Sequence, residues 1–246
     1  MPALLVPKRV TVCVPTYNER ENVEPMVAAL LERLGPDDRV LVIDDSSPDG
    51  TGEVADRLAA TEPRVAVLHR AAKEGLGPAY IAGFRRALAE GADLVLEVDC
   101  DFSHDPDDVP RLIAASREAD LVLGSRYVPG GRIENWGALR RFVSRVGSLY
   151  AQTLLAVPVR DLTGGFKCYR REVLERIDLD AVVARGYAFQ IETTYRALRA
   201  GFRVVEVPIT FVDRRVGTSK MSPAIATEAI WRVPYLRALA LAGRLR

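Results

Sequence analysis

The stretch LVLEVDCDFSHDPDDVPRLIAASREADLVL, residues 94–123, decides the fold. It begins with a short apolar run over 94–98 and ends with another over 121–123, and both runs are typical of buried strands. Asp105 followed by a proline is typical of a helix start and predicts a helix that continues to about Glu118. A strand, a helix and a second strand in this order predict a parallel α/β sheet with helices on both faces.

The same alternation extends outward from this stretch through the first half of the chain. Short β-branched or apolar runs predict strands at residues 9–14, 40–43 and 65–68. Helical spacing of apolar residues predicts helices at residues 23–34, 53–60 and 78–90. Asn18, with the acid Glu21 three residues later, predicts the cap of the first helix. In such sheets ligands bind beyond the carboxyl ends of the strands, so the residues that follow each strand are the candidates for a site.

The second half of the chain is less regular. We expect loops at residues 127–137 and 213–220, a turn and strand within 161–169, and a strand at 203–207. Helices are expected at residues 140–155, 186–200 and 223–241. Pro234 argues against one long helix in the last of these ranges. Neither a repeat nor a linker is evident, so we expect a single domain.

Composition excludes several classes of protein. The 246 residues are 48% hydrophobic and 27% charged, which is enough to bury a core and excludes global disorder. No run of about 18 apolar residues predicts a membrane span. The segment 1–7 has no basic region before an apolar core, so no secretory signal is expected. Three scattered cysteines form neither a disulfide framework nor a zinc motif, which indicates a soluble protein of a reducing compartment.

The net charge of +1 conceals an asymmetry between the two halves. Residues 1–123 carry 13 Lys/Arg and 23 Asp/Glu, a net charge of 13 − 23 = −10, and residues 124–246 carry 21 and 10, a net charge of 21 − 10 = +11. Chance composition is one explanation. The alternative is an acidic half that holds a cation and a basic half that holds anions. No aromatic-interleaved basic stripe predicts nucleic-acid binding.

Two acidic motifs follow buried strands. Asp99 and Asp101 flank Cys100, and side chains two apart on an extended chain point to one face. Paired carboxylates suit Mg²⁺ or Mn²⁺, with a substrate diphosphate at other coordination positions. Such a tripeptide alone is equally typical of a solvated turn, but its place after a strand favours the metal interpretation. Asp45, after Asp44, fits either a nucleoside contact or a turn.

Other catalytic motifs are absent or incomplete. Gly75 and Gly77 open a helix, but Tyr80 stands where a dinucleotide fingerprint needs its third glycine. Neither a Walker A, an HExxH nor a GxSxG pattern occurs. His69 is expected to be structural, and His104 belongs to no recognisable triad. Arginines suit phosphate oxygens, and the basic candidates of the second half are Arg126, Arg140, Arg141, Arg145, Arg214, Arg215 and Lys220.

Taken together, these residues resemble inverting glycosyltransferases of the nucleotide-diphospho-sugar (GT-A) type, and more narrowly the polyprenol monophosphomannose synthases, also called dolichol-phosphate mannosyltransferases. The matching stretches run in order along nearly the whole chain: VPTYNERENV (14–23), VIDDSSPDGTGEVA (42–55), KEGLGPAYIAGF (73–84), EVDCDFSHDPDDVPRLI (97–113), GSRYVPGG (124–131), DLTGGFKCYRREVL (161–174), GYAFQIETTYRA (186–197) and VPITFVDRRVGTSKM (207–221). Cys100 departs from the family, where alanine is usual, and this small change should be tolerated.

The resemblance implies a Rossmann-like GT-A domain and inverting transfer of mannose from GDP-mannose to a polyprenyl phosphate, with Mg²⁺ or Mn²⁺ as cofactor. It places the donor against Pro15, Tyr17, Glu19, Ile43, Asp45, Asp99, Cys100, Asp101, Arg214 and Lys220. It places the metal at Asp99, Asp101 and Ser103. It places the acceptor phosphate at Arg126, Arg140 and Ser144, with Asp101 and Arg126 as the catalytic pair. The acceptor phosphate is already an anion, so the chemistry needs no dedicated base.

The resemblance also suggests where the protein works. Residues 1–222 would form the catalytic domain, and residues 223–246 a helical tail that lies in a membrane interface or docks on a membrane-embedded partner protein. The expected location is the cytoplasmic face of a membrane, as a peripheral protein. Three alternatives stay open: a sibling enzyme that uses UDP-glucose, a non-catalytic donor-binding subunit, and a nucleic-acid phosphoryl-transfer enzyme.

Overall fold

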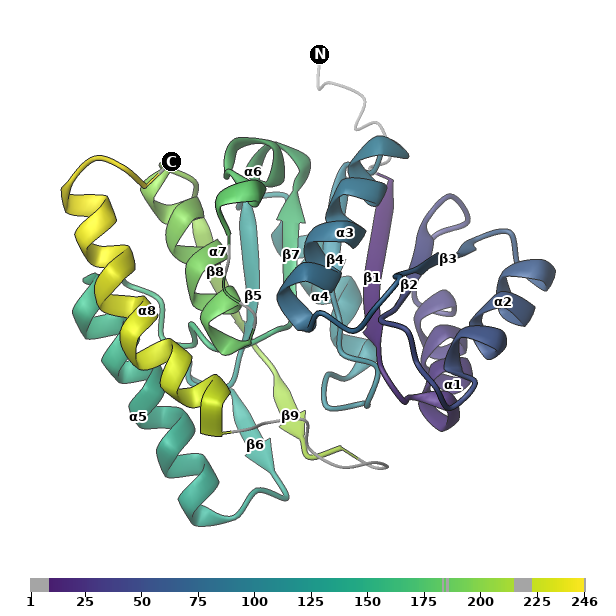
Figure 1. Cartoon of the computed structure of the whole chain (residues 1–246), viewed down its shortest axis with the longest axis horizontal. Coiled ribbons are helices and arrows are strands. Elements are labelled where there is room, and N and C mark those ends of the chain that lie inside the picture. The colour runs from purple at the N-terminus through teal and green to yellow at the C-terminus, as the bar shows by residue number, and fades with distance from the viewer. Residues whose placement is uncertain (1–8, 183, 185, 215–222, 246) are drawn as a thin grey trace.

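The computed structural model describes residues 9–182, 184, 186–214 and 223–245 (Figure 1). The strands are β1 (Val10–Thr16), β2 (Arg39–Asp44), β3 (Val65–His69), β4 (Leu94–Glu97), β5 (Leu121–Ser125), β6 (Arg132–Glu134), β7 (Lys167–Arg170), β8 (Val204–Pro208) and β9 (Thr210–Val212). The α-helices are α1 (Arg20–Leu31), α2 (Thr51–Thr61), α3 (Leu76–Ala89), α4 (Val109–Ala115), α5 (Ala138–Leu155), α6 (Arg171–Arg176), α7 (Tyr187–Arg199) and α8 (Pro223–Leu241), and short 3₁₀ turns lie at Pro106–Asp108 and Leu179–Ala181.

Seven strands form one sheet in the order β3-β2-β1-β4-β7-β5-β8. All neighbours are parallel except β7, which runs antiparallel between β4 and β5. A separate two-stranded parallel sheet joins β6 to β9 at one end of the molecule (Figure 1). The expected mostly parallel sheet is therefore confirmed.

Alternating strand residues supply two cores, one on each face of the sheet. Val10, Val12 and Val14 of β1 pack with α1, α2 and α4, whereas Cys13 faces the core formed with α3, α6 and α7. Helix α3 lies close to the sheet at Gly83, because glycine has no side chain to keep them apart. A Cβ at this position would lie only 2.3 Å from the Ile43 side chain. This layering leaves the carboxyl ends of the central strands uncovered, and the candidate site forms there.

The structure confirms one of the two predicted helix caps and corrects the other. Asp105 caps its 3₁₀ turn as expected, since its side chain accepts the N–H of Asp107 at 3.0 Å. The expected Asn18 cap is wrong: α1 begins after Glu19, and Asn18 adopts a left-handed conformation with φ of 54°. An asparagine adopts this conformation more readily than most residues.

Two expectations for the second half are also corrected. Residues 127–137 are not wholly a loop, since β6 lies among them and pairs with β9. Helix α8 runs through Pro234 without a break. Arg232 beside this proline donates to the buried Glu192 of α7, and Arg237 donates to the Leu155 carbonyl of α5. These contacts hold the helix on both sides of the proline, which offsets the hydrogen bond that proline cannot make.

Candidate active site

A cavity of about 520 Å³ opens at the carboxyl ends of the parallel strands. The structure brings most of the expected site residues into its wall. They are Pro15, Tyr17, Glu19, Asp45, Asp99, Cys100, Asp101, Ser103, Arg126, Arg140 and Arg214. The acidic motifs of the first half and the arginines of the second half therefore face one space.

Three expected site residues are not among those that line this cavity. Ile43 is fully buried in the core beneath it, against α3. Ser144 is half-buried on α5 and accepts a hydrogen bond from the Tyr127 hydroxyl at 2.7 Å. Lys220 lies outside the described residues, as does Arg215.

The two carboxylates after β4 lie at the floor of the cavity. The Tyr80 hydroxyl donates to Asp99 at 3.3 Å, and the Ser103 N–H donates to Asp101 at 3.1 Å. Burial, followed by the negative charges of Asp101 and Glu97, raises the pKa of Asp99 to about 7. A cation placed between the carboxylates would relieve this unfavourable arrangement.

A guanidinium already contacts the acidic pair. The Arg214 side chain ion-pairs with Asp101 at 3.2 Å. No cluster of three or more His, Cys, Asp or Glu side chains suited to a metal occurs in the described ranges. The donor set of Asp99, Asp101 and Ser103 is all oxygen, which fits Mg²⁺ or Mn²⁺ provided that substrate oxygens complete the coordination.

Arg126 is held by a buried acid that sequence reasoning missed. Asp161 accepts the Arg126 guanidinium in a bidentate pair at 2.8 and 2.7 Å, and also its backbone N–H at 2.9 Å. Burial opposes the charge of Asp161, but the guanidinium and these hydrogen bonds hold its pKa below the ordinary value. Thr163 accepts a further hydrogen bond from Arg126 at 2.9 Å. Asp161 lies 35 residues from Arg126, so no local pattern could reveal the pair.

Aromatic side chains form the wall beside the arginines. The Arg140 guanidinium lies 4.1 Å from the centroid of the Trp136 ring, and Trp136 meets Phe211 edge to face. The Trp136 indole N–H is buried and has no hydrogen-bond partner within the described residues. Arg140 also ion-pairs with Asp213 at 2.8 Å. Trp136 of this wall lies in the segment 127–137, which we expected to be a loop, and Phe211 lies in β9, for which the sequence predicted no element.

His104 fixes the backbone of the acidic motif. Its Nδ1 accepts the Asp99 N–H at 3.2 Å, and its ring stacks on Phe166 at 4.9 Å between centroids. Burial lowers the pKa of His104 to about 4, so the ring is neutral at neutral pH. His69 lies outside the cavity wall and bonds to Asp56 at 2.9 Å.

Asp45 is bonded to the loop that follows β3. It accepts the N–H groups of Glu74 and Gly75 at 3.2 and 3.0 Å, and it ion-pairs with Arg70. Lys73 of the same loop lies 3.7 Å above the Tyr17 ring. The Asp45 carboxylate thus holds residues 70–76 against the cavity.

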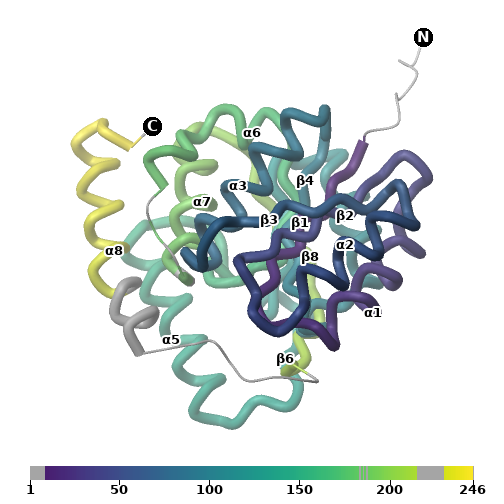
Figure 2. Tube along the Cα trace, turned by 45° about the vertical axis from the view of Figure 1, so that its right-hand side comes forward, coloured from purple at the N-terminus to yellow at the C-terminus, as the bar shows by residue number. Residues whose placement is uncertain are grey.

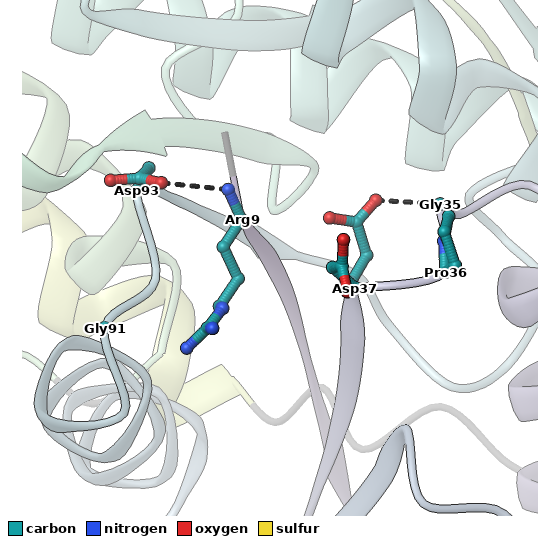
Figure 3. A pocket seen from close by; sticks show the side chains of 7 residues that line it. Arg9, Gly35, Pro36, Asp37, Gly91 and Asp93 are labelled. Atoms are coloured by element: carbon teal, nitrogen blue, oxygen red, sulfur yellow. Dashed lines mark hydrogen bonds between the residues drawn. The ribbon is translucent and has the colours of Figure 1, made fainter. Parts of the chain in front are cut away.

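A second cavity of about 540 Å³ lies at the amino ends of the strands (Figure 3). Its residues precede β1, β2 and β4, and the Arg9 N–H donates to Asp93 at 2.9 Å. Gly35 donates to Asp38 at 2.8 Å on the other side. This cavity is at the opposite edge of the sheet from Asp99 and Asp101.

Comparison with known proteins agrees with this arrangement. Residues 11–178 match the model of glycosyl transferase family 2. The chain belongs to this family. It is 51% identical over 225 residues to undecaprenyl-phosphate mannosyltransferase of Micrococcus luteus, covering 92% of each chain. It is 49% identical over 235 residues to polyprenol monophosphomannose synthase of Mycolicibacterium smegmatis, covering 94% of this chain and 88% of the relative. The expected family and enzyme class are confirmed.

Solved structures support the GT-A fold of this family 2 enzyme. Glucosyl-3-phosphoglycerate synthase of Mycobacterium tuberculosis, solved with Mn²⁺, UDP-glucose and phosphoglyceric acid, superposes with a TM-score of 0.65. It is 20% identical, and the match covers 96% of this chain and 80% of that one. The same enzyme solved with UDP alone gives a TM-score of 0.63 at 21% identity.

None of the helices in the described residues is both long and apolar enough to cross a bilayer.

Proposed function

We propose that this glycosyltransferase transfers mannose from GDP-mannose to a polyprenyl phosphate, with inversion at the anomeric carbon. One observation carries the proposal: the carboxylates Asp99 and Asp101 share a cavity with Arg126, Arg140 and Arg214. The two carboxylates, together with Arg214, suit a metal–diphosphate donor, whereas Arg126 and Arg140 suit a second phosphate. The names of the two relatives at about 50% identity support mannose as the sugar and a polyprenyl phosphate as the acceptor.

The donor side of the cavity is formed by the first half of the chain. Pro15, Tyr17 and Glu19 follow β1 in its wall, and Asp45 holds the loop that completes it. Lys73 above Tyr17 adds a positive charge to this wall. We assign the guanosine to this side, with Ile43 beneath it in the core, and the diphosphate to the side of Cys100 and Arg214.

Asp99, Asp101 and Ser103 would hold a divalent metal, which when bound would supply positive charge to the leaving diphosphate. Arg214 ion-pairs with Asp101, so it can bind the same diphosphate, together with Lys220 of the segment that follows it. His104 holds the backbone of Asp99 and so orients the motif.

Arg126 and Arg140 would hold the acceptor phosphate, with Ser144 near them on α5. Asp161 holds the Arg126 guanidinium in a bidentate pair, so the position of the guanidinium is set before the acceptor binds. Fixed cations lower the repulsion between two anionic substrates and cost little reorganisation during the reaction.

The reaction needs no base from the protein. An oxygen of the acceptor phosphate forms a bond to the anomeric carbon while the bond from that carbon to the donor diphosphate breaks. The nucleoside diphosphate leaves with the electron pair of the broken bond, and attack from the opposite face inverts the configuration. Arg126 orients the nucleophile, and the cations around Asp101 stabilise the charge of the leaving group.

We place the enzyme on the cytoplasmic face of a membrane, as a peripheral protein whose catalytic domain is residues 1–222. The lipid acceptor supports the membrane location. The thiols of Cys13, Cys100 and Cys168 are buried and form no disulfide, which supports a reducing compartment.

A transfer assay with a panel of donors tests the proposal. Purified protein is incubated with labelled GDP-mannose or UDP-glucose, a polyprenyl phosphate in detergent and Mn²⁺, and the label extracted into organic solvent is counted. We expect counts from GDP-mannose, abolished by EDTA and by Asp101→Asn. Counts from UDP-glucose alone would assign the sibling reaction, and donor binding without transfer in the presence of metal would assign a non-catalytic subunit.

A further inference from the structure

The proposed reaction requires the transferred sugar to lie between two parts of the cavity. The donor diphosphate is assigned to Asp99 and Asp101 after β4, and the acceptor phosphate to Arg126 after β5. In the sheet, β7 lies between these two strands and runs antiparallel to both, and its first residue, Lys167, pairs with each of them. The segment that leads into β7 therefore lies between the two phosphate sites.

This segment contains two glycines that line the cavity, Gly164 and Gly165. A Cβ on Gly164 would lie 3.3 Å from the carbonyl oxygen of Gly124, so the chain passes close to the end of β5. The wall of the cavity at this point is bare backbone. A substrate can therefore approach the wall closely here, which is a common use of glycine beside a ligand.

The amide of Gln190 lies beside Gly165. The Gln190 side chain is 1% exposed, and neither its oxygen nor its nitrogen forms a hydrogen bond within the described residues. A Cβ on Gly165 would lie 3.3 Å from the amide nitrogen, 3.8 Å from His104 Cε1 and 3.9 Å from Asp99 Oδ2. Because His104 and Asp99 line the cavity, the amide borders the same space. A buried amide without partners costs stability unless a ligand supplies them.

The nearby carboxylate of Glu97 does not meet this need. Burial raises the pKa of Glu97, and Lys167 and the Gln190 side chain oppose that rise. One oxygen of Glu97 accepts a hydrogen bond from the Tyr169 hydroxyl at 2.9 Å, and the other has no hydrogen-bond partner among the residues that the structure describes. The attraction between Gln190 and Glu97 therefore leaves the hydrogen-bonding capacity of the amide unused.

Helix α7 holds Gln190 in this position. The helix begins after Gly186, which lines the cavity, so Gln190 lies in its first turn. It packs between α3 and α8 (Figures 1 and 2): Phe189 stacks on Tyr80 of α3 with 6.0 Å between ring centroids, and Glu192 accepts a hydrogen bond from α8. A side chain held from both sides in this way is positioned before a ligand binds.

We infer that Gln190 determines sugar specificity: its amide hydrogen-bonds a hydroxyl group of the transferred sugar, while the sugar ring lies over Gly164 and Gly165. A hydroxyl donates and accepts, as a carboxamide does, so it suits the amide atoms that the protein leaves without partners. This inference rests on the proposed function and adds a contact to the sugar itself. A site that hydrogen-bonds a substrate hydroxyl rejects the analogue that lacks it.

Deoxy donors test this contact. Transfer by the parent and by Gln190→Met, which keeps the length of the side chain without the amide, is measured with GDP-mannose and with each of its monodeoxy-mannose analogues. We expect kcat/KM of the parent to fall at least about tenfold with one analogue. Gln190→Met should show that loss already with GDP-mannose and no further loss with the same analogue. Affinity for GDP with Mn²⁺, measured by calorimetry, should stay as in the parent, because GDP has no sugar to transfer.

Two further variants separate the contact from a structural role. Gln152→Met replaces the other glutamine of the chain, which is half-buried on α5 and outside the cavity wall, and should match the parent. Gly165→Ala places a Cβ beside the Gln190 amide, at a backbone conformation that alanine adopts without strain. It should lower kcat/KM with GDP-mannose at least about tenfold while GDP affinity is retained, and it carries the test if Gln190→Met does not fold.

Several outcomes would overturn the inference. Equal kcat/KM of the parent and Gln190→Met, a parent indifferent to every deoxy analogue, or losses that simply add would each do so. A loss of GDP affinity in Gln190→Met would overturn it in favour of structural support for the metal motif. Failure of the parent with GDP-mannose would defeat the proposed function, and UDP-glucose would then decide the contact. In that case Gln190→Met should bind UDP as the parent does and UDP-glucose more weakly, and equal binding of both would overturn the inference.

Discussion

At the residue scale, the position of Arg126 depends on Asp161, an acid that is not among the residues lining the cavity. Asp161 is fully buried and accepts three hydrogen bonds from Arg126, two from the guanidinium and one from the backbone. Without that charge the guanidinium would lose its fixed position and remain buried beside an uncharged partner. We therefore propose that Asp161 is a positioning residue for the proposed acceptor-phosphate site.

Replacing Asp161 tests this dependence. We expect Asp161→Asn to lower the free energy of unfolding by about 3 kcal/mol, because one partner of a buried ion pair is lost. The rate of transfer should fall while nucleotide affinity, measured by calorimetry, stays unchanged. Glu175→Gln is the control, since Glu175 forms an exposed ion pair with Arg171 and such pairs contribute less than about 1 kcal/mol. Unchanged transfer by Asp161→Asn would contradict the role.

The buried His104 predicts a pH dependence of stability. Its pKa is about 4 in the folded chain, and an unfolded histidine has a pKa of about 6.5. Between these values the unfolded state binds a proton that the folded state does not, so the free energy of unfolding falls as the pH falls, by up to about 3 kcal/mol. His104→Asn keeps an acceptor for the Asp99 N–H and should flatten this decline in urea titrations.

His69 is the matched comparison for His104. Its hydrogen bond to Asp56 raises its pKa, so its contribution to stability is present at low pH and is lost as the pH rises through the folded-state value. Replacing His69 by asparagine should therefore steepen the decline toward acid that His104→Asn flattens. Equal slopes for the parent and His104→Asn would contradict the assignment.

At the scale of elements, regular strands and helices of the first half could be predicted because each combines local periodicity with a clear end signal. The antiparallel position of β7 between β4 and β5 could not be predicted, because it depends on pairing between residues about 70 positions apart, such as Glu97 and Lys167. The three-residue strands β6 and β9 are too short to show a period. The predicted helix break at Pro234 was wrong, because the tertiary contact of Arg232 with Glu192 outweighs the low helix propensity of proline.

The candidate site divides in the same way. Asp99, Asp101 and Arg126 became candidates because of their residue types and their places after strands, and the family resemblance supplied their roles. Asp161, Trp136 and Arg70 instead reach the site through long-range contacts. The loop 70–76 is the clearest example. Its N–H groups bond to Asp45 of a different strand end, and no sequence pattern reports that bond.

The contacts of Asp45 with the loop 70–76 predict that loosening this loop weakens binding of the donor. Arg70→Ala removes the ion pair with Asp45 and should loosen residues 70–76. We expect the KM for the donor to rise about tenfold with kcat little changed, because the loop contributes to ground-state binding. Arg64→Ala, which removes an ion pair with Glu62 outside the cavity, should leave both constants as in the parent. A fall in kcat with unchanged KM would contradict this role of the loop in donor binding.

At the scale of the whole molecule, the charge asymmetry of the sequence has a spatial counterpart. The strands β3, β2, β1 and β4 of the acidic half form one side of the sheet, and β8 with the arginine-bearing α5 and α8 lies at the other (Figure 1). The cavity opens where the two sides meet, at the end of β4. We propose that this placement allows one site to hold a cation and two anionic substrates.

The position of bound Mn²⁺, measured by anomalous diffraction from crystals grown with GDP and MnCl₂, tests that claim most directly. We predict one strong peak within coordination distance of Asp99 or Asp101 oxygens, with the GDP diphosphate between the metal and Arg214. A peak remote from both carboxylates, or a nucleotide bound outside this cavity, would contradict the account.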